Sequence, residues 1–256
     1  MFNVQAATFA VEERCLLQPL DLNLQGGQVH GLIGHNGSGK STLLKLLARQ
    51  QPRSSGEITF DGRSLDDWRP REFARQVAYL PQQLPESGAL LGKELVAFGR
   101  YPWRGLLGRQ NAEDRHQIER AMALTHTEAF ADRPVGLLSG GERQRLWLAM
   151  LLAQQSRFLL LDEPLSALDI AHQVDVLKLI QKLTRELDLG VVIVLHDINM
   201  AARYCDNLVA LHQGRLLEQG PPATLMTNEV LARIYGLPLQ VVPHPQDACP
   251  VALVPA

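Results

Sequence analysis

The sequence has few cysteines. Only 3 of its 256 residues are cysteine, namely Cys15, Cys205 and Cys249, and they are far apart and form no C-x-x-C pair. This spacing argues against a disulfide framework and against a zinc site, and it indicates a reducing compartment.

The sequence also lacks a long apolar run and a large net charge. Its longest apolar candidate, residues 189–195, has the length of a strand, far short of the roughly 18 residues that span a bilayer. The first residues hold no basic segment followed by an apolar one, so we expect no signal peptide. A net charge of −2 gives no general affinity for nucleic acid, and we expect no nucleic-acid partner. We therefore expect a soluble, cytoplasmic protein unless something else holds it at a membrane.

The most informative stretch is GHNGSGKST, residues 34–42, which fits the pattern G-x-x-x-x-G-K-[ST]. A short apolar run precedes it, as a buried strand would, and a helical run follows. Glycines let the backbone wrap closely around an anion, so that N–H groups and the helix N-terminus point at phosphates. Lys40 can reach the β- and γ-phosphates, and the Ser41 hydroxyl can bind Mg²⁺. The residues expected to bind a nucleotide here are Gly34, His35, Asn36, Gly37, Ser38, Gly39, Lys40, Ser41 and Thr42.

A second motif is an apolar run, residues 158–161, that ends in Asp162 and Glu163. A buried parallel strand with this ending places both carboxylates at the carboxyl edge of a sheet, where ligands bind in open α/β folds. Asp162 is suited to hold the Mg²⁺ that Ser41 also contacts, and Glu163 is suited to polarise the attacking water. Alone, the pair could equally cap a helix.

A third motif is LSGGERQ, residues 138–144, which precedes a helical run through Ala153. Ser139 can cap that helix, while Gly140 and Gly141 leave its first N–H groups open to an anion. On its own, the pattern is also typical of an ordinary capped helix.

Taken together, the motifs resemble those of the ATP-binding-cassette (ABC) ATPases, whose signature is LSGGERQ. Gln82 matches the family's Q-loop glutamine, which reports the Mg²⁺ and γ-phosphate state to a partner, and His196 matches its switch histidine. Residues 166–169, Ser-Ala-Leu-Asp, match its D-loop. The resemblance implies that Glu163, His196, Gln82 and Lys40 are catalytic and that Ser41, Gln82 and Asp162 hold Mg²⁺.

The fold implied by this resemblance is α/β. It has a P-loop NTPase (RecA-like) core with a mostly parallel sheet, an N-terminal antiparallel β subdomain and a helical signature subdomain at about 84–155. The nucleotide-binding domain then spans 2–240 and is followed by a C-terminal tail, 241–256. From the residues alone we expect residues 99–105 to interrupt the helical pattern and the proline-rich tail after Pro238 to be loosely ordered.

Several further stretches, among them residues 79–85, 99–103, 171–177 and 195–206, resemble the ATPase subunit of bacterial ferric hydroxamate (siderophore) importers. The resemblance implies a head-to-tail pair of cassettes with ATP between the phosphate loop of one and Ser139, Gly140 and Gly141 of the other. It also implies transmembrane permease subunits, a periplasmic binding protein and a location at the cytoplasmic face of the bacterial inner membrane. A cobalamin, haem or other iron-chelate importer would look nearly the same, and an ABC ATPase acting on ribosomes or DNA is a further alternative.

Two parts of the sequence allow more than one interpretation, namely the expected adenine contact and the aromatic residues near position 100. The family's adenine-stacking aromatic residue is replaced by Val11, so adenine contact is aliphatic or uses Arg14 through cation–π stacking, and preference for ATP over GTP is open. Tyr101 and Trp103 lie where the family docks its permease, but they could equally fill the core of the helical subdomain.

Overall fold

A sheet of six strands runs through the middle of the molecule, in the order β10-β9-β3-β8-β7-β6. The computed structural model describes residues 1–12, 14–105, 108–166 and 168–255. Strand β10 is antiparallel to β9, and the other neighbours are parallel. The strands are β3 (Val29–Ile33), β6 (Val77–Leu80), β7 (Phe158–Leu161), β8 (Gly190–Val194), β9 (Asn207–His212) and β10 (Arg215–Gly220).

The central strands β7 and β8 are buried along their whole length. Alternate side chains enter two different cores, so that Leu159 and Leu161 join one and Phe158 and Leu160 the other. Because both faces are covered, the strands are continuously apolar rather than alternating. This explains why the sequence predicted them as uninterrupted apolar runs.

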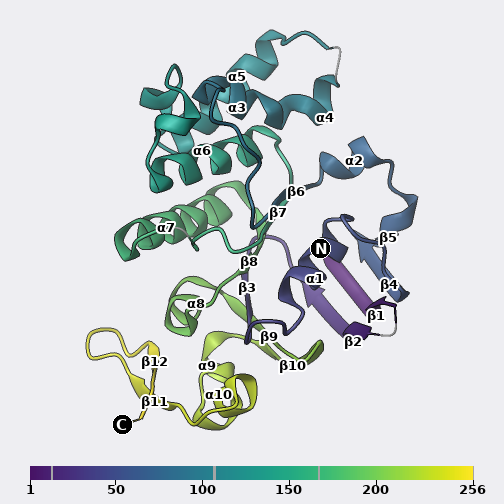
Figure 1. Cartoon of the computed structure of the whole chain (residues 1–256), viewed down its shortest axis with the longest axis vertical. Coiled ribbons are helices and arrows are strands. Elements are labelled where there is room, and N and C mark those ends of the chain that lie inside the picture. Colours follow the sequence, from purple (N-terminus) through teal and green to yellow (C-terminus); the bar gives the residue numbers. More distant parts are fainter. Residues whose placement is uncertain (13, 106–107, 167, 256) are drawn as a thin grey trace.

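Helices cover one face of this sheet, and a helix with a second sheet covers the other (Figure 1). On the first face lie α6 (Gly140–Ala153), α7 (Ile170–Leu187) and α8 (Ile198–Tyr204). Leu177, Ile180 and Leu183 of α7 recur at helical spacing and are buried against the sheet. On the second face lies α1 (Lys40–Leu47), which begins two residues earlier than the predicted helical run.

The second sheet is antiparallel, in the order β2-β1-β4-β5, which confirms the predicted N-terminal β subdomain. Phe2 of β1 meets Phe60 of β4 and Phe158 of the parallel sheet edge to face, with ring centroids 4.9 and 5.1 Å apart. This aromatic cluster joins the two sheets. The elements of this part are β1 (Phe2–Val11), β2 (Arg14–Leu24), β4 (Ser55–Phe60), β5 (Arg63–Ser64), the 3-10 helix η1 (Leu65–Asp67) and α2 (Pro70–Ala74).

A group of helices extends from one end of the sheet, at the top of Figure 1. The expectation that residues 99–105 interrupt the helical pattern was wrong, because two short helices span most of that stretch. Pro102 takes the second position of α4, where no backbone N–H is required, and Gly105 ends the helix at φ +74°. Besides α6, the group comprises α3 (Gly92–Ala97), η2 (Phe98–Arg100), α4 (Tyr101–Arg104), α5 (Ala112–Leu124), η3 (Glu128–Phe130) and η4 (Val135–Leu137).

The C-terminal tail forms a hairpin, so the expectation of loose order was also wrong. Its strands follow α9 (Pro222–Leu225) and α10 (Asn228–Tyr235), and they are β11 (Gln240–Pro243) and β12 (Pro250–Leu253). Pro243 pairs with Pro250 at the end of the ladder, where a missing N–H costs least. The Asn199 side chain of α8 accepts from the Ala252 N–H at 2.7 Å and donates to the Ala252 carbonyl at 3.1 Å. In the described ranges, no helix has the length and apolarity required to cross a membrane.

One buried ion pair joins the helices at the top of the molecule. The Arg100 Nε donates to Asp114 Oδ1 at 2.9 Å, and both residues are buried. Arg100 also donates to the Ala153 carbonyl at 2.8 Å and to Gln155 Oε1 at 2.6 Å. Burial alone would raise the pKa of Asp114, but the hydrogen bonds from Arg100 and from the Asn111 N–H hold that pKa below its ordinary value.

We predict that Asp114→Ala lowers the free energy of unfolding by about 3–5 kcal/mol, because the Arg100 charge is then buried without a partner. Urea unfolding monitored by circular dichroism measures the loss. The exposed Glu119 of the same helix is the matched control, and Glu119→Ala should change stability by no more than about 0.5 kcal/mol. Equal effects of the two substitutions would contradict the prediction. Since the folded-state pKa of Asp114 is depressed, its contribution is present above the unfolded value of about 3.9 and is lost as the pH falls through the folded value.

Candidate functional site

Residues 34–39 form the predicted loop between the carboxyl end of β3 and α1, and residues 40–42 are the first residues of α1. Gly34 has φ +139°, and a Cβ there would lie 2.2 Å from the Leu211 carbonyl oxygen. Gly39 takes a left-handed conformation, φ 103°, immediately before α1. Only glycine fits both positions, and the resulting loop turns the open N-terminus of α1 toward a cavity. Such a helix start attracts phosphate.

Lys40 is buried in this loop with 5% of its surface exposed. Its Nζ donates to the carbonyl oxygens of Gly34 at 2.8 Å and His35 at 3.0 Å. Burial lowers the pKa of Lys40, while the negative charges of Glu163 and Asp162 oppose that shift. The ammonium group therefore has the loop carbonyls as partners and two carboxylates nearby, and a phosphate would supply the missing negative charge at close range.

Asp162 lies directly after β7 and contacts Ser41 of α1. The Ser41 Oγ donates to Asp162 Oδ1 at 2.8 Å, and Asp162 is 1% exposed. Burial and the charge of Glu163 raise the pKa of Asp162, against the opposing hydrogen bond from Ser41. A buried carboxylate beside a hydroxyl is a pair of hard oxygen ligands, and a cation at this point would stabilise the charged carboxylate.

Glu163 is held by two side chains from different strand ends. Gln82 Nε2 donates to Glu163 Oε2 at 2.7 Å, and His196 Nε2 lies 2.9 Å from Glu163 Oε1. Gln82 follows β6 and His196 follows β8, so three neighbouring parallel strands meet at one carboxylate. Glu163 has φ +50°, a left-handed conformation that costs a non-glycine residue about 1–2 kcal/mol. Strained backbone of this kind is frequent at functional sites.

These groups surround one cavity of ≈ 440 Å³ at the carboxyl edge of the sheet. The structure thus brings together the phosphate loop, Gln82, Glu163 and His196 as predicted, with Asp162 behind Ser41. The residues that line the cavity are Arg14, Leu16, Asn36, Gly37, Gly39, Lys40, Ser41, Thr42, Gln82, Glu163 and His196.

The signature residues Ser139, Gly140 and Gly141 lie apart from the lining of this cavity. Ser139 is exposed and caps α6, with its Oγ accepting from the Glu142 N–H at 3.3 Å and its own N–H donating to Glu142 Oε2 at 2.8 Å. Gly140 borders a smaller cavity of ≈ 60 Å³ that Gln82 and Glu163 also line. The predicted helix cap is confirmed. None of the three signature residues lines the nucleotide cavity of ≈ 440 Å³.

Helix α7 follows the segment that matches the D-loop, and its first turn lies against Gly141 of the signature motif. Asp169 caps α7 by accepting from the His172 N–H at 2.9 Å. A Cβ on Gly141 would come within 2.4 Å of the His172 ring, so only glycine allows this contact. Ala167 of the predicted D-loop lies outside the described residues.

Arg14 of β2, one of the expected adenine contacts, lines the cavity. Val11, at the expected adenine position, pairs with Arg14 across the β1–β2 hairpin and is 48% exposed. Two residues near the site were not assigned by the sequence. Leu16 of β2 lines the cavity, and Tyr79 lies near Asp162, where burial and the charge of Asp162 raise the pKa of Tyr79 to about 12. Only the neighbouring motifs in the sequence could have pointed to Leu16 and Tyr79.

A family model described as "ABC transporter" matches residues 17–166. Among curated proteins, the chain is 42% identical to the petrobactin import ATP-binding protein of Bacillus anthracis, over 94% of this chain and 89% of that protein. It is 36% identical to the iron(3+)-hydroxamate import ATP-binding protein of Bacillus subtilis, over 94% and 90%. It is 42% identical to the hemin import ATP-binding protein of Streptomyces coelicolor, over 91% and 82%.

Solved structures agree with this relationship. An inward-facing ABC transporter assigned to the metal-chelate type superposes with a TM-score of 0.86 at 25% identity, covering 98% of this chain and 96% of that chain. A dimeric bacterial ABC transporter cassette superposes with a TM-score of 0.74 at 26% identity, covering 87% and 99%. The chain therefore belongs to the ABC transporter family, and it is an ABC-type ATPase with the cassette fold.

Proposed function

We propose that this protein is the ATP-hydrolysing subunit of a bacterial ABC importer for an iron chelate. The observation that carries the hydrolytic role is Glu163, held between Gln82 and His196 beside the phosphate loop. The import role is supported by relatives whose names assign them to petrobactin, iron(3+)-hydroxamate and hemin import. The nucleotide-binding domain of this proposal spans residues 2–240, with a helical subdomain at about 84–155.

In this proposal the loop of residues 34–42 holds the ATP phosphates. The N–H groups at the start of α1 and the Lys40 ammonium supply the positive charge that the phosphates require. The Lys40 Nζ donates to two loop carbonyls. Stronger hydrogen bonds to the negatively charged phosphate oxygens would replace these two. Arg14 and Leu16 line the same cavity and offer the base a cation and an aliphatic surface.

Three oxygen donors fit Mg²⁺, namely the Ser41 Oγ, the Asp162 carboxylate and the Gln82 side-chain carbonyl. Ser41 and Asp162 already lie 2.8 Å apart, and the Gln82 amide uses its Nε2 for Glu163, which leaves its oxygen for a cation. Hard oxygen ligands of this kind are those that Mg²⁺ prefers. Bound there, Mg²⁺ would neutralise phosphate charge during transfer.

Glu163 is then the group that orients and polarises the attacking water. Its two carboxylate oxygens are each fixed, one by Gln82 and one by His196, so the side chain cannot rotate freely. Phosphoryl transfer depends on positioning and charge stabilisation more than on covalent chemistry. His196 is 46% exposed at its side chain, which leaves it accessible to the γ-phosphate.

The complete site is proposed to need a second copy of the chain. The large cavity is bordered by the phosphate loop but not by Ser139 and Gly141, and the open N-terminus of α6 has its first N–H groups available for an anion. A head-to-tail pair would bring that helix start over the phosphates of the other copy. The similarity to a dimeric cassette supports this arrangement.

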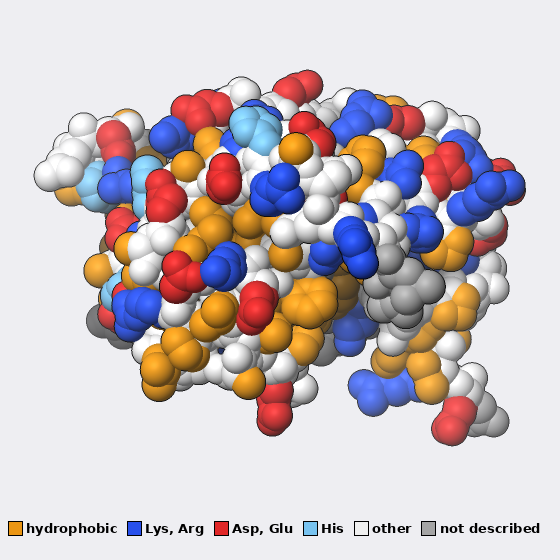
Figure 2. All heavy atoms as spheres, turned by 90° about the horizontal axis from the view of Figure 1, so that it is seen from above, with side chains coloured by type: hydrophobic (Ala, Val, Ile, Leu, Met, Phe, Trp, Pro, Cys, Tyr) orange, Lys and Arg blue, Asp and Glu red, His pale blue; other side chains and the backbone are white. Residues whose placement is uncertain are grey.

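The permease is proposed to dock on the helical end of the molecule. Seen from that end, hydrophobic side chains form several groups among lysines and arginines (Figure 2). Phe98, Tyr101 and Trp103 are 53%, 45% and 39% exposed. Trp103 is also partly structural, because its Nε1 donates to the Gln154 carbonyl at 2.7 Å and its ring lies against Arg75 and Arg100. A peripheral position at the cytoplasmic face of the inner membrane, and indirect coupling to a periplasmic binding protein, follow from such docking.

The cargo is proposed to be a ferric siderophore, with ferric hydroxamate as the specific candidate. The motif stretches that resemble the hydroxamate importers support this choice, but the relatives named for petrobactin and hemin are equally or more similar. The residues that carry the resemblance surround the nucleotide or the docking surface, and a cassette does not touch the cargo. Cobalamin and haem are the alternatives, followed by a non-transport role on ribosomes or DNA.

Glu163→Gln should abolish steady-state ATP hydrolysis, with a loss of about 10²–10⁴-fold, because an amide cannot accept the proton of the attacking water. ATP-driven dimerisation should persist, since Gln82, His196 and the phosphate loop are unchanged. Phosphate release measures the first effect and size-exclusion chromatography with ATP the second. The exposed Glu186 of α7 supplies the control Glu186→Gln. Near-normal hydrolysis by the Glu163 variant would refute its assigned role.

Trp103→Ala and Tyr101→Ala should weaken assembly with the permease without lowering affinity for ATP. The alanines remove exposed aromatic area at the docking surface, and interface aromatics often cost more than 1 kcal/mol when truncated. Co-purification with a co-expressed iron-chelate permease and nucleotide titration give the two readouts. Leu237→Ala removes a similarly exposed side chain elsewhere, 42% exposed, and should change neither. If both aromatic variants assemble with the permease as well as the unchanged protein does, the proposed docking surface is wrong.

Reconstituted with its permease and binding protein, the complex should show the greatest stimulation of ATP hydrolysis by ferric hydroxamate. Catecholate siderophore, haem and cobalamin serve as the competing ligands in the same vesicles. If only haem or cobalamin stimulates ATP hydrolysis, the siderophore assignment is wrong, while the proposed importer role still holds. Co-purification with ribosomes or DNA, and with no polytopic membrane protein, would overturn the importer itself.

A further inference from the structure

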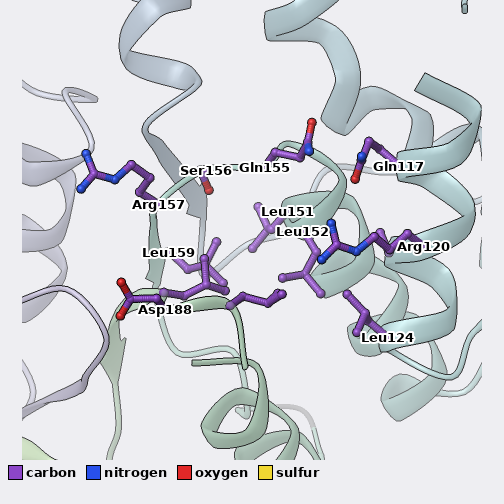
Figure 3. A pocket seen from close by; sticks show the side chains of 13 residues that line it. Gln117, Arg120, Leu124, Leu151, Leu152, Gln155, Ser156, Arg157, Leu159 and Asp188 are labelled. Carbon is purple, nitrogen blue, oxygen red and sulfur yellow. The ribbon is translucent and has the colours of Figure 1, made fainter. Parts of the chain in front are cut away.

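A second cavity, of ≈ 340 Å³, lies at the edge of the sheet opposite the nucleotide site. It is bordered by α5, the end of α6, the connection to β7, and the turn between α7 and β8 (Figure 3). Leu159 near the start of β7 lines it, whereas Asp162 and Glu163 follow the end of that strand. Four strand residues correspond to about 13 Å, so this cavity is separate from the phosphate site.

The walls of this cavity are mainly aliphatic. Its volume is at the small end of the range of about 300–1,000 Å³ in which proteins bind small molecules. Leucines from three different segments point into the same space (Figure 3). The apolar lining includes Ala121, Leu124, Leu151, Leu152, Leu159 and Leu189.

Several polar groups of the cavity can donate hydrogen bonds, beside Gln117, whose Nε2 is already used for Glu113 at 2.7 Å. The Ser156 hydroxyl is buried, and it has no hydrogen-bond partner among the described residues. Gln155 accepts from Arg100 through its Oε1 at 2.6 Å, which leaves its NH₂ group for another partner. Arg120 of α5 extends its guanidinium toward the leucines (Figure 3), and within the described ranges it forms no ion pair.

The other charged side chains at the rim are turned away or occupied. The Asp188 carboxylate points away from the leucines (Figure 3), and its Oδ1 lies beside Gly27. Arg157 pairs with Asp61 outside the cavity. The charge that faces the apolar space is therefore the single positive charge of Arg120, and the donors beside it require an acceptor.

We propose that this cavity binds a small amphiphilic carboxylate, with its apolar body against the leucines and its carboxylate at Arg120, Gln155 and Ser156. A carboxylate accepts several hydrogen bonds at once and pairs with guanidinium in a bidentate geometry. A cation would meet Arg120 with like charge, and a neutral alcohol would gain no ion pair with this exposed guanidinium. The apolar walls exclude a small hydrophilic anion as the preferred ligand.

The bound molecule would contact both the helical part and the sheet core. Leu151 and Leu152 belong to the last turns of α6, whose first residues are the signature glycines, and Leu159 and Leu189 belong to the core. A ligand in this position bridges the two parts and stabilises their present arrangement, so binding should raise the midpoint of thermal unfolding.

Octanoate, octan-1-ol and octylammonium are suitable probes, because they share one chain length and differ in charge. We expect octanoate to bind the purified full-length protein saturably, one per chain, in calorimetric titrations without nucleotide. Its affinity should exceed that of octan-1-ol by about tenfold, the value of one charge-assisted hydrogen bond, and octylammonium should bind more weakly still. Absence of saturable octanoate binding, or equal binding of the ammonium probe, would overturn the proposal.

Variants of the lining provide the second arm of the experiment. Arg120→Ala should weaken octanoate about tenfold and leave octan-1-ol unchanged, and Leu124→Trp should fill the space and weaken both. Arg115→Ala removes an exposed arginine from the same helix outside the cavity and should have no effect. Thermal unfolding without ligand checks that each variant is folded. Octanoate affinity that is the same in the Arg120, Leu124 and Arg115 variants would refute this site, whatever the outcome at Glu163.

Discussion

The hydrogen bond between Ser41 and Asp162 is the contact on which the nucleotide site depends. It joins residues 121 positions apart in the sequence, and it fixes the first turn of α1 against the end of β7. The bond is partly buried, with the Asp162 side well enclosed and Ser41 at the wall of the cavity. With these two elements locked, the phosphate loop on one side and Glu163 on the other take up fixed positions around the same cavity.

The parallel sheet brings further side chains to the same place as the Ser41–Asp162 contact. Because β6, β7 and β8 are neighbours and parallel, the residues that follow them emerge at one edge. Gln82, Glu163 and His196 meet there although about 80 residues separate the first two. The opposite edge of the sheet is the amino end of the same strands. It holds a mainly aliphatic cavity with Arg120, which forms no ion pair with the residues that the structure describes. The two ends differ because the carboxyl edge carries the phosphate loop with Asp162 and Glu163 beside it, whereas the Asp188 carboxylate at the amino edge points away from the leucines (Figure 3).

The helical part of the molecule packs on the sheet through a continuous apolar core, in which Val96, Ile118 and Trp147 join Leu80 and Leu159. Arg100 and Asp114 pair in a buried position, and α6 links the signature residues at its start to the second cavity at its end. The C-terminal hairpin is attached to α8 through Asn199, and α8 follows His196 by one residue. The hairpin therefore places ordered structure on the helix that follows His196 of the proposed ATP site.

The sequence by itself determined the phosphate loop, the acidic strand end, the capped signature helix and the buried strands, because each depends on local spacing and on residue chemistry within a few positions. It did not determine helix α4 or the C-terminal hairpin, because prolines at strand ends and helix starts look the same locally as prolines in loops. Only the tertiary structure brought Gln82 and His196 to the two oxygens of Glu163, gave Glu163 its left-handed backbone, and left Arg120 facing leucines. Those features arise from contacts between distant segments, which no local pattern specifies.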